Sequence, residues 1–417
     1  MHIQFPFNRL YLTLLIGTLL TLQSRVSAQQ SIPRNNPIKK QPSSVILTGA
    51  DQTDLYLSLL KGANIAVFAN QTATVGKTHL VDTLLKAGIH ISRIFSPEHG
   101  FRGEADAGEH VGSSADPKTG IPIISLYGSK RKPSAEDLAG IDIMLFDIQD
   151  VGVRFYTYIS SLQEYIESAV VNHRPLIILD RPNPNGSYVD GPVLDKKFRS
   201  FVGMQPIPIV YGMTIGEYAK MLIGEQWLDS AANTGLKDFR LTIIPCKGYT
   251  HHSRYPLPVK PSPNLPNAQA VALYPSLCLF EGTAFSLGRG TDKPFQQFGH
   301  PSLPKDLYHF TPASLPGAKN PPLLDQTCYG YDLSKIDVAK TTGNRFSLQW
   351  LIKAYRLFPD KGHFFLPNQF FNRLAGNDTL QQQIKDGKTE EEIRKSWEPA
   401  LSNYKATRKK YLLYKDF

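Results

Sequence analysis

Residues 89–100 read Ile-His-Ile-Ser-Arg-Ile-Phe-Ser-Pro-Glu-His-Gly, and this stretch decides the fold class. The first seven residues, Ile89–Phe95, have the apolar and β-branched character of a buried strand. A polar loop follows directly and carries Glu98 and His99, then Arg102, among glycines. Open α/β sheets bind ligands in loops that leave the carboxyl ends of their strands. The stretch therefore predicts a sheet strand that ends in a functional site.

Similar apolar runs flank this strand along the chain. The further predicted strands are Ile65–Ala69, Ile121–Leu126, Ile141–Phe146, Leu176–Leu179 and Leu241–Pro245. Helical patterns lie between and after them, at His79–Ala87, Ser134–Leu138, Ser160–Val171 and Thr214–Ile223. Alternation of this kind predicts an α/β domain with a mostly parallel sheet and helices on both faces.

Length and a change in sequence character predict two domains. A chain of 417 residues is too long for one compact core. A proline-dense passage begins at Pro256, and helical patterns return at Ser347–Phe358 and Thr389–Tyr404. We expect the α/β domain to span residues 46–262 and a smaller α+β domain to span residues 263–417.

The N-terminus has the pattern of a secretory signal peptide. Arg9 precedes an apolar run, Leu10–Leu22, and small residues follow at positions 26–28. We expect residues 1–28 to be removed, which leaves residues 29–45 as a flexible, proline-rich N-terminus. The protein is then exported, periplasmic or extracellular, and has no membrane attachment; an uncleaved anchor is the alternative.

Composition argues against several classes of protein. The net charge of +10 comes from scattered basic residues, so no nucleic-acid partner is expected. Cys246, Cys278 and Cys328 match no zinc motif, and we expect buried thiols, with one disulfide as the alternative. No G-x-G-x-x-G motif follows the first predicted strand, and no cofactor is expected.

Metal binding is only weakly indicated. His99, Asp106 and His110 lie near one another in the sequence, and His251-His252 lies further along. Their spacing matches no defined metal motif, so we assign no metal ligands. A metal-dependent hydrolase is kept as an alternative.

Two more strand ends carry polar and aromatic residues. Ile141–Phe146 leads into Asp147, Asp150, Arg154, Tyr156 and Tyr158, and Leu176–Leu179 leads into Asp180, Arg181 and Asn183. Parallel strands point their carboxyl ends to one edge, so these loops should converge with the Glu98 loop. Aromatic rings beside Arg and Asp suit a sugar site.

The individual carboxylates allow different roles. A carboxyl group in a partly dehydrated cleft can serve as a general acid, and Glu98 is the candidate, with a salt bridge to Arg102 as the alternative. We favour a structural role for Asp180 and a substrate-binding or supporting role for Asp147 and Asp150.

A second cluster of glycine and charge lies in the expected C-terminal domain. Glu281 follows an apolar run, and Arg289 and Asp292 come shortly after it. Glu281 is a second candidate carboxylate, and a structural pairing with Arg289 is an equal alternative.

Four motifs in this order resemble one bacterial family. They are Ser96-Pro97-Glu98-His99-Gly100, the Asp147–Tyr158 stretch, Asp180-Arg181-Pro182-Asn183-Pro184, and Glu281-Gly282 with Arg289-Gly290. The chain resembles the exo-β-N-acetylmuramidases of the NamZ type from about Ile65 to the C-terminus. The resemblance implies a Rossmann-like domain joined to a smaller domain, with the site in the cleft between them.

The resemblance also implies an activity and a set of site residues. It implies an exo-acting glycosidase that releases N-acetylmuramic acid from the non-reducing ends of peptidoglycan fragments. Glu98 matches the family's proposed catalytic glutamate, and cleft arginines would bind the lactyl carboxylate. We predict four catalytic residues, Glu98, His99, Asp147 and Glu281. The predicted substrate-binding residues are Arg102, Asp150, Arg154, Tyr156, Tyr158, Asn183, Arg289 and Asp292.

Two other classes stay open beside the muramidase. One is a non-catalytic protein that binds cell-wall sugars on the same fold, and the other is the metal-dependent hydrolase. The sequence predicts muramyl saccharides from peptidoglycan as the partner and says nothing of the oligomeric state.

Overall fold

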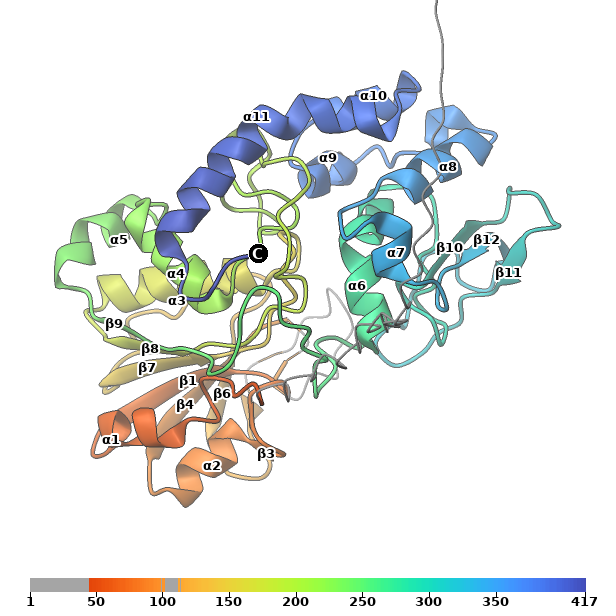
Figure 1. Ribbon diagram of the computed structural model, residues 1–417. Helices are drawn as coiled ribbons and strands as arrows, with labels where there is room; N and C mark the ends of the chain where they lie inside the picture. Colours follow the sequence, from red (N-terminus) through yellow and green to blue (C-terminus); the bar gives the residue numbers. More distant parts are fainter. Residues whose placement is uncertain (1–44, 99, 102–111, 113) are drawn as a thin grey trace, which may run out of the picture. The chain divides into compact units, whose positions relative to one another are not determined.

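A parallel sheet occupies the first half of the chain (Figure 1). The structure is a computed structural model that describes residues 45–98, 100, 101, 112 and 114–417. The expected signal peptide, nearly all of the expected flexible N-terminus, His99 and Arg102 lie outside the described residues.

Seven strands form the sheet. They are β1 (Asn64–Ala69), β4 (His90–Ser96), β5 (Ser114–Ala115), β6 (Pro122–Ser125), β7 (Ile143–Asp147), β8 (Leu176–Leu179) and β9 (Leu241–Ile244). Their order is β5-β6-β4-β1-β7-β8-β9. All neighbours are parallel except β5, which pairs antiparallel with β6 at one edge. The predicted strands are thus found, with small shifts at their ends.

Helices cover both faces of this sheet (Figure 1). One face carries α1 (Leu57–Leu60) and α2 (Leu80–Lys86), and the other carries α3 (Tyr158–Val171), α4 (Ile215–Gly224) and α5 (Ser230–Gly235). A two-stranded ribbon, β2 (Thr74–Val75) with β3 (Thr78–His79), precedes α2. The short 3-10 turns are η1 (Thr53–Leu55), η2 (Lys196–Phe198) and η3 (Leu236–Asp238).

One predicted helix, Ser134–Leu138, is wrong, because the segment forms only a turn. The capping contact exists, since the Asp137 N–H donates to Ser134 Oγ at 3.3 Å. The chain then reaches Gly140, whose φ of 72° is left-handed, and turns away toward β7. The capping residue Ser134 therefore begins a turn, and the chain reverses at Gly140 before a helix can form.

The C-terminal part combines helices with a small antiparallel sheet. The sheet order is β10-β12-β11, formed by β10 (Gln297–His300), β11 (Tyr308–Phe310) and β12 (Cys328–Asp332). The helices are α6 (Ala268–Leu277), α7 (Val338–Thr342), α8 (Gln349–Leu357), α9 (Phe370–Ala375), α10 (Thr379–Lys385) and α11 (Glu390–Arg408), with the 3-10 turns η4 (Cys278–Gly282), η5 (Lys361–His363) and η6 (Lys409–Tyr411). The expected fold class is confirmed, whereas the boundary at residue 262 stays a prediction.

Alternation along β1 divides the core into two clusters. Ile65 and Val67 belong to the cluster that includes Leu84 of α2. Phe68 belongs to the other cluster, which includes Tyr165 of α3. This second cluster continues without a break into the C-terminal part of the chain. The sheet is therefore buried on both faces, and the two halves of the chain share apolar packing.

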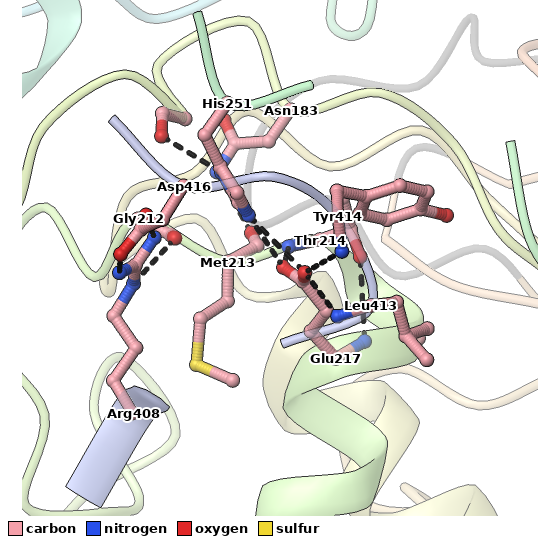
Figure 2. A network of polar contacts seen from close by, with 12 residues as sticks. Asn183, Gly212, Met213, Thr214, Glu217, His251, Arg408, Leu413, Tyr414 and Asp416 are labelled. Carbon is pink, nitrogen blue, oxygen red and sulfur yellow. Dashed lines mark hydrogen bonds and ion pairs between the residues drawn. The ribbon is translucent and has the colours of Figure 1, made fainter. Parts of the chain in front are cut away.

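The chain's last residues are tied to α4 through a polar network (Figure 2). Glu217 is fully buried and accepts hydrogen bonds from the Leu413 N–H at 2.8 Å and the Tyr414 N–H at 3.3 Å. Its carboxylate also lies 3.1 Å from His251 Nε2. Arg408 donates to both carboxylate oxygens of Asp416, at 2.7 and 2.8 Å. We call this group, Glu217, His251, Arg408 and residues 413–416, the C-terminal anchor.

Asp180 is part of the same region, and its contacts agree with the structural role that the sequence favours. The buried carboxylate accepts hydrogen bonds from Thr214 Oγ1 at 2.7 Å, the Gly216 N–H at 2.8 Å and the Tyr414 hydroxyl at 2.5 Å. Burial raises the pKa of Asp180 to about 6. Asp180 thus joins the end of β8 to α4 and to the tail.

Two smaller expectations also find answers. Cys246, Cys278 and Cys328 are buried free thiols, as expected, and no disulfide joins them. No helix in the described part of the chain combines the length and apolar character that a membrane crossing needs.

Candidate active site

A cavity of about 490 Å³ is lined by residues from both halves of the chain. The first half contributes loops that follow β4, β6 and β7, and the second half contributes residues of α6, η4, α9 and the loops beside them. Its lining residues are Glu98, Tyr127, Gly128, Arg131, Phe155, Tyr156, Thr157, Tyr158, Phe201, Val202, Ser262, Asn264, Leu265, Tyr274, Glu281, Arg289, Phe295 and Phe370. The loops after β4 and β7 thus converge, as expected, whereas the loop after β8, with Asp180, Arg181 and Asn183, does not line the cavity.

Glu98 lines this cavity and is held by hydroxyl groups from two neighbouring loops. The Tyr127 hydroxyl donates to Glu98 Oε1 at 3.0 Å, and Thr157 Oγ1 donates to Oε2 at 3.3 Å. Burial, and after it the Glu98 charge, raise the pKa of Tyr127 well above its ordinary value. The phenol therefore stays protonated and keeps donating at any physiological pH.

Glu281 is a second carboxylate in the cavity lining. Arg289 donates to its Oε1 from Nε at 3.0 Å and from Nη2 at 2.6 Å. The Cys278 thiol donates to Oε2 at 3.3 Å, and burial raises its pKa well above the ordinary value. The sequence left open whether Glu281 is a second site carboxylate or a structural partner of Arg289. In the structure it lines the cavity and is also paired with Arg289.

Aromatic side chains give the cavity its apolar surface. The rings of Tyr156 and Tyr158 lie 4.7 Å apart at an interplanar angle of 70°. The Tyr156 hydroxyl donates to the Pro261 carbonyl at 2.8 Å, and the Tyr158 hydroxyl accepts from Asn70 Nδ2 at 2.9 Å. The hydroxyls thus fix both rings, which are buried and form part of the apolar wall of the cavity.

Asp147 and Asp150 lie outside the cavity lining, although the sequence analysis named both. Arg181 Nη2 donates to the fully buried Asp147 at 2.8 Å. Asp150 accepts from the Gly152 N–H at 2.5 Å and from the Tyr211 hydroxyl, and burial raises its pKa to about 7. Through these contacts, both side chains stabilise the conformation of the loop after β7.

Arg154 and Asn183 are also enclosed by protein. Arg154 is fully buried and donates to the carbonyls of Pro192, Ile207, Leu374 and Ala375 at 2.7–2.9 Å. Burial lowers the pKa of Arg154 to about 9. Its guanidinium therefore holds α9 against the first half of the chain, and we no longer count it among the substrate contacts.

Asn183 packs against a glycine that the loop requires. Asn183 Nδ2 donates to the Met213 carbonyl at 2.8 Å, and its Oδ1 accepts from the Asn185 N–H at 2.8 Å. Gly152 has a φ of 77°, and a Cβ there would lie 2.0 Å from Asn183 Oδ1. Asn183 thus fills space against the backbone of the β7 loop instead of lining the cavity.

The structure therefore gathers five of the named residues at one cavity: Glu98, Tyr156, Tyr158, Glu281 and Arg289. Asp292 is exposed and does not line it. His99 and Arg102 lie outside the described residues, so their predicted roles stay predictions.

Sequence reasoning missed Tyr127, Arg131 and Thr157. Tyr127 and Arg131 follow the predicted strand Ile121–Leu126, so the strand-end rule that found Glu98 applied to them too. Thr157 lies between the two tyrosines that were named. Phe201 and Phe370 carried no comparable signal, because neither follows a strand of the parallel sheet.

Comparison with protein families matches two adjoining models along the chain. Residues 65–269 match the N-terminal model of the exo-β-N-acetylmuramidase NamZ, and residues 272–414 match its C-terminal model. The peptidoglycan β-N-acetylmuramidase NamZ of Bacillus subtilis (strain 168) is 37% identical over 415 residues, which cover 93% of this chain and 95% of that protein.

Solved structures agree with this result. Crystal structures of two DUF1343 family proteins from Bacteroides fragilis NCTC 9343 match with TM-scores of 0.82 and 0.76. They are 48% and 27% identical in sequence, and each match covers 90% of this chain and all of the other. Through its motifs, its fold and both family models, the chain belongs to the NamZ family of exo-β-N-acetylmuramidases.

Proposed function

We propose that the chain is an exo-acting glycoside hydrolase that releases N-acetylmuramic acid from the non-reducing ends of peptidoglycan fragments. The observation that supports this most directly is the position of Glu98 in an aromatic cavity that also contains Glu281. A protein that cleaves sugars needs a carboxyl group for proton transfer and a surface that packs on the ring. Family membership supplies the substrate class.

In this proposal Glu98 transfers the proton to and from the reacting oxygen. The hydroxyls of Tyr127 and Thr157 hold its carboxyl group in one orientation. This lowers the entropic cost of positioning the group for proton transfer. Glu281, which is paired with the Arg289 guanidinium, stabilises the positive charge that develops at the sugar. Tyr156 and Tyr158 form part of the apolar wall beside the sugar ring.

Product analysis tests the proposal. The protein is incubated with a disaccharide of N-acetylmuramic acid linked to N-acetylglucosamine, and the sugars are separated and identified. We expect free N-acetylmuramic acid from the wild type and at least about 100-fold less, in the same time, from the Glu98→Gln variant. Tight binding of the disaccharide by the wild type without release of either sugar would instead establish a non-catalytic binding protein.

The metal-dependent alternative needs a separate experiment. The described residues hold no group of three or more His, Cys, Asp or Glu side chains arranged for a metal, but His99, Asp106 and His110 lie outside them. We expect activity to survive thorough chelation and dialysis. Loss of activity that returns with one added divalent metal would favour the metal-dependent hydrolase.

We also propose that the protein is exported. The basis is the N-terminal sequence alone, with Arg9, the apolar run Leu10–Leu22 and the small residues at 26–28. Fractionation of producing cells and N-terminal sequencing test this proposal. We expect the mature chain outside the cytoplasm, beginning at Gln29, and an uncleaved chain in the membrane fraction would contradict it.

A further inference from the structure

The charges that line the cavity are not all paired. Four charged side chains of the described residues contribute to it, namely Glu98, Glu281, Arg131 and Arg289. Arg289 is committed to Glu281 through two hydrogen bonds. Arg131 makes no ion pair with a carboxylate in the described part of the chain. The cavity therefore presents one positive group that is available to an anion from outside.

Arg131 is held in place by contacts that leave some of its N–H groups available for further hydrogen bonds. Its guanidinium carbon lies 4.3 Å from the centre of the Phe201 ring, and its Nε donates to the Gly128 carbonyl at 3.4 Å. Both neighbours line the cavity as well. Stacking on a ring fixes the guanidinium plane, and the contact through Nε leaves the two terminal nitrogens for another acceptor.

Terminal nitrogens in one plane match the two oxygens of a carboxylate. Muramic acid carries such a group, because its lactyl ether ends in a carboxylate. The family resemblance implied that cleft arginines bind this carboxylate, and the arginines predicted to bind substrate were Arg102, Arg154 and Arg289. Arg154 is enclosed by four backbone carbonyls, Arg289 is paired with Glu281, and Arg102 is outside the described residues.

Resting on the proposed function, we propose that Arg131 binds the lactyl carboxylate and so selects muramic acid over N-acetylglucosamine. Arg131 is an exposed residue of the loop after β6, and it lines the cavity. Glu98, in the same cavity, acts on the glycosidic bond. Arg131 thus acts as a specificity residue that contacts substrate away from the reacting atoms.

The test uses two chromogenic β-glycosides, one of N-acetylmuramic acid and one in which its lactyl carboxylate is a methylamide. We expect the wild type to favour the acid, and Arg131→Gln to lower kcat/KM for the acid about 10- to 100-fold, as for loss of a hydrogen-bonded charge. The methylamide should react equally with both proteins. Arg131→Lys should recover part of the loss, because it keeps the charge and lacks the fork.

Lys130→Gln is the matched control, since Lys130 is a half-buried cation of the same loop that pairs with Asp137 and does not line the cavity. It should change neither substrate's kcat/KM. Equal losses on acid and methylamide in Arg131→Gln, or no loss on the acid, would overturn the assignment.

Binding separates this inference from the proposed function. Calorimetry with N-acetylmuramic acid and N-acetylglucosamine measures recognition whether or not a bond is cleaved. If the wild type hydrolyses neither glycoside but Arg131→Gln still loses its preference for muramic acid, the proposed function fails and the inference stands. If hydrolysis occurs and the variant keeps that preference, the inference fails alone.

Discussion

Two glutamates of this molecule, Glu98 and Glu217, have the same side chain but different surroundings. The surroundings determine whether the carboxyl group can meet a ligand or stabilises the fold. Glu217 has no exposed surface, and its partners are backbone N–H groups and His251. Glu98 faces a cavity, and its named partners are the hydroxyls of Tyr127 and Thr157. A carboxylate enclosed by fixed donors holds the fold together, whereas one that faces a cavity can meet a ligand.

The largest effect should come from Glu98→Gln. The amide keeps the shape of the side chain but cannot transfer a proton, so we expect kcat to fall about 10²- to 10⁴-fold. The melting temperature should stay near that of the wild type, because the amide has nearly the same size and the side chain is only half-buried. Steady-state kinetics and calorimetry check both halves, and full activity in the variant would remove Glu98 from the mechanism.

The opposite pattern is expected for Glu217→Ala. Removing one partner of a buried charged network costs about 3–5 kcal/mol of unfolding free energy. Urea titration measures this loss, and the folded variant should keep the wild-type KM. Glu392 provides the control, because it occupies the same capping-box position in α11 but is exposed. If Glu392→Ala destabilises the protein as much, the enclosure of Glu217 is not the cause.

Asp150 is a third carboxyl group, which is buried like that of Glu217 and belongs to the loop after β7 that also carries part of the cavity lining. Burial raises its pKa in the folded chain from 3.8 to about 7, so the folded state binds this proton more tightly than the unfolded state. The contribution of Asp150 to stability is therefore present at low pH and is lost as the pH rises toward about 7.

Asp150→Asn removes this titration. Between about pH 4.5 and pH 8, the stability of the wild type relative to the variant should fall by about 3 kcal/mol. Urea titrations of both proteins at the two pH values measure the difference. A relative stability that rises with pH would show that the folded chain keeps Asp150 ionised.

The smallest effect should come from Tyr127→Phe. The change removes one hydrogen bond to Glu98 while Thr157 still donates to the other oxygen, so kcat should fall only about 3- to 10-fold. KM should change little, since the ring still lines the cavity. A loss as large as that of Glu98→Gln would mean that the phenol itself takes part in the chemistry.

The sheet and the place of the cavity could be predicted from the sequence because both depend on local pattern. Apolar runs such as Ile89–Phe95 become strands, and the rule for parallel strand ends brings Glu98 to the loop after β7. The pairing of Glu281 with Arg289 could also be predicted, since the two residues are only eight positions apart in the sequence.

Arg154 shows why the remainder of the site could not be predicted. Its acceptors are backbone carbonyls at residues 192, 207, 374 and 375. Every residue has a backbone carbonyl, so the amino-acid sequence does not indicate which of them lie near Arg154. An arginine beside tyrosines therefore resembles a ligand-binding residue until the fold is known. The same holds for Glu217, whose partners at 413 and 414 come from the far end of the chain.

The C-terminal anchor has a consequence for truncation of the protein. Glu217, Asp180 and Arg408 receive part of their hydrogen bonds from residues 413–416, in addition to partners elsewhere in the fold. Removing residues 413–416 would leave three buried side chains short of hydrogen-bond partners, so the truncated protein should be less stable.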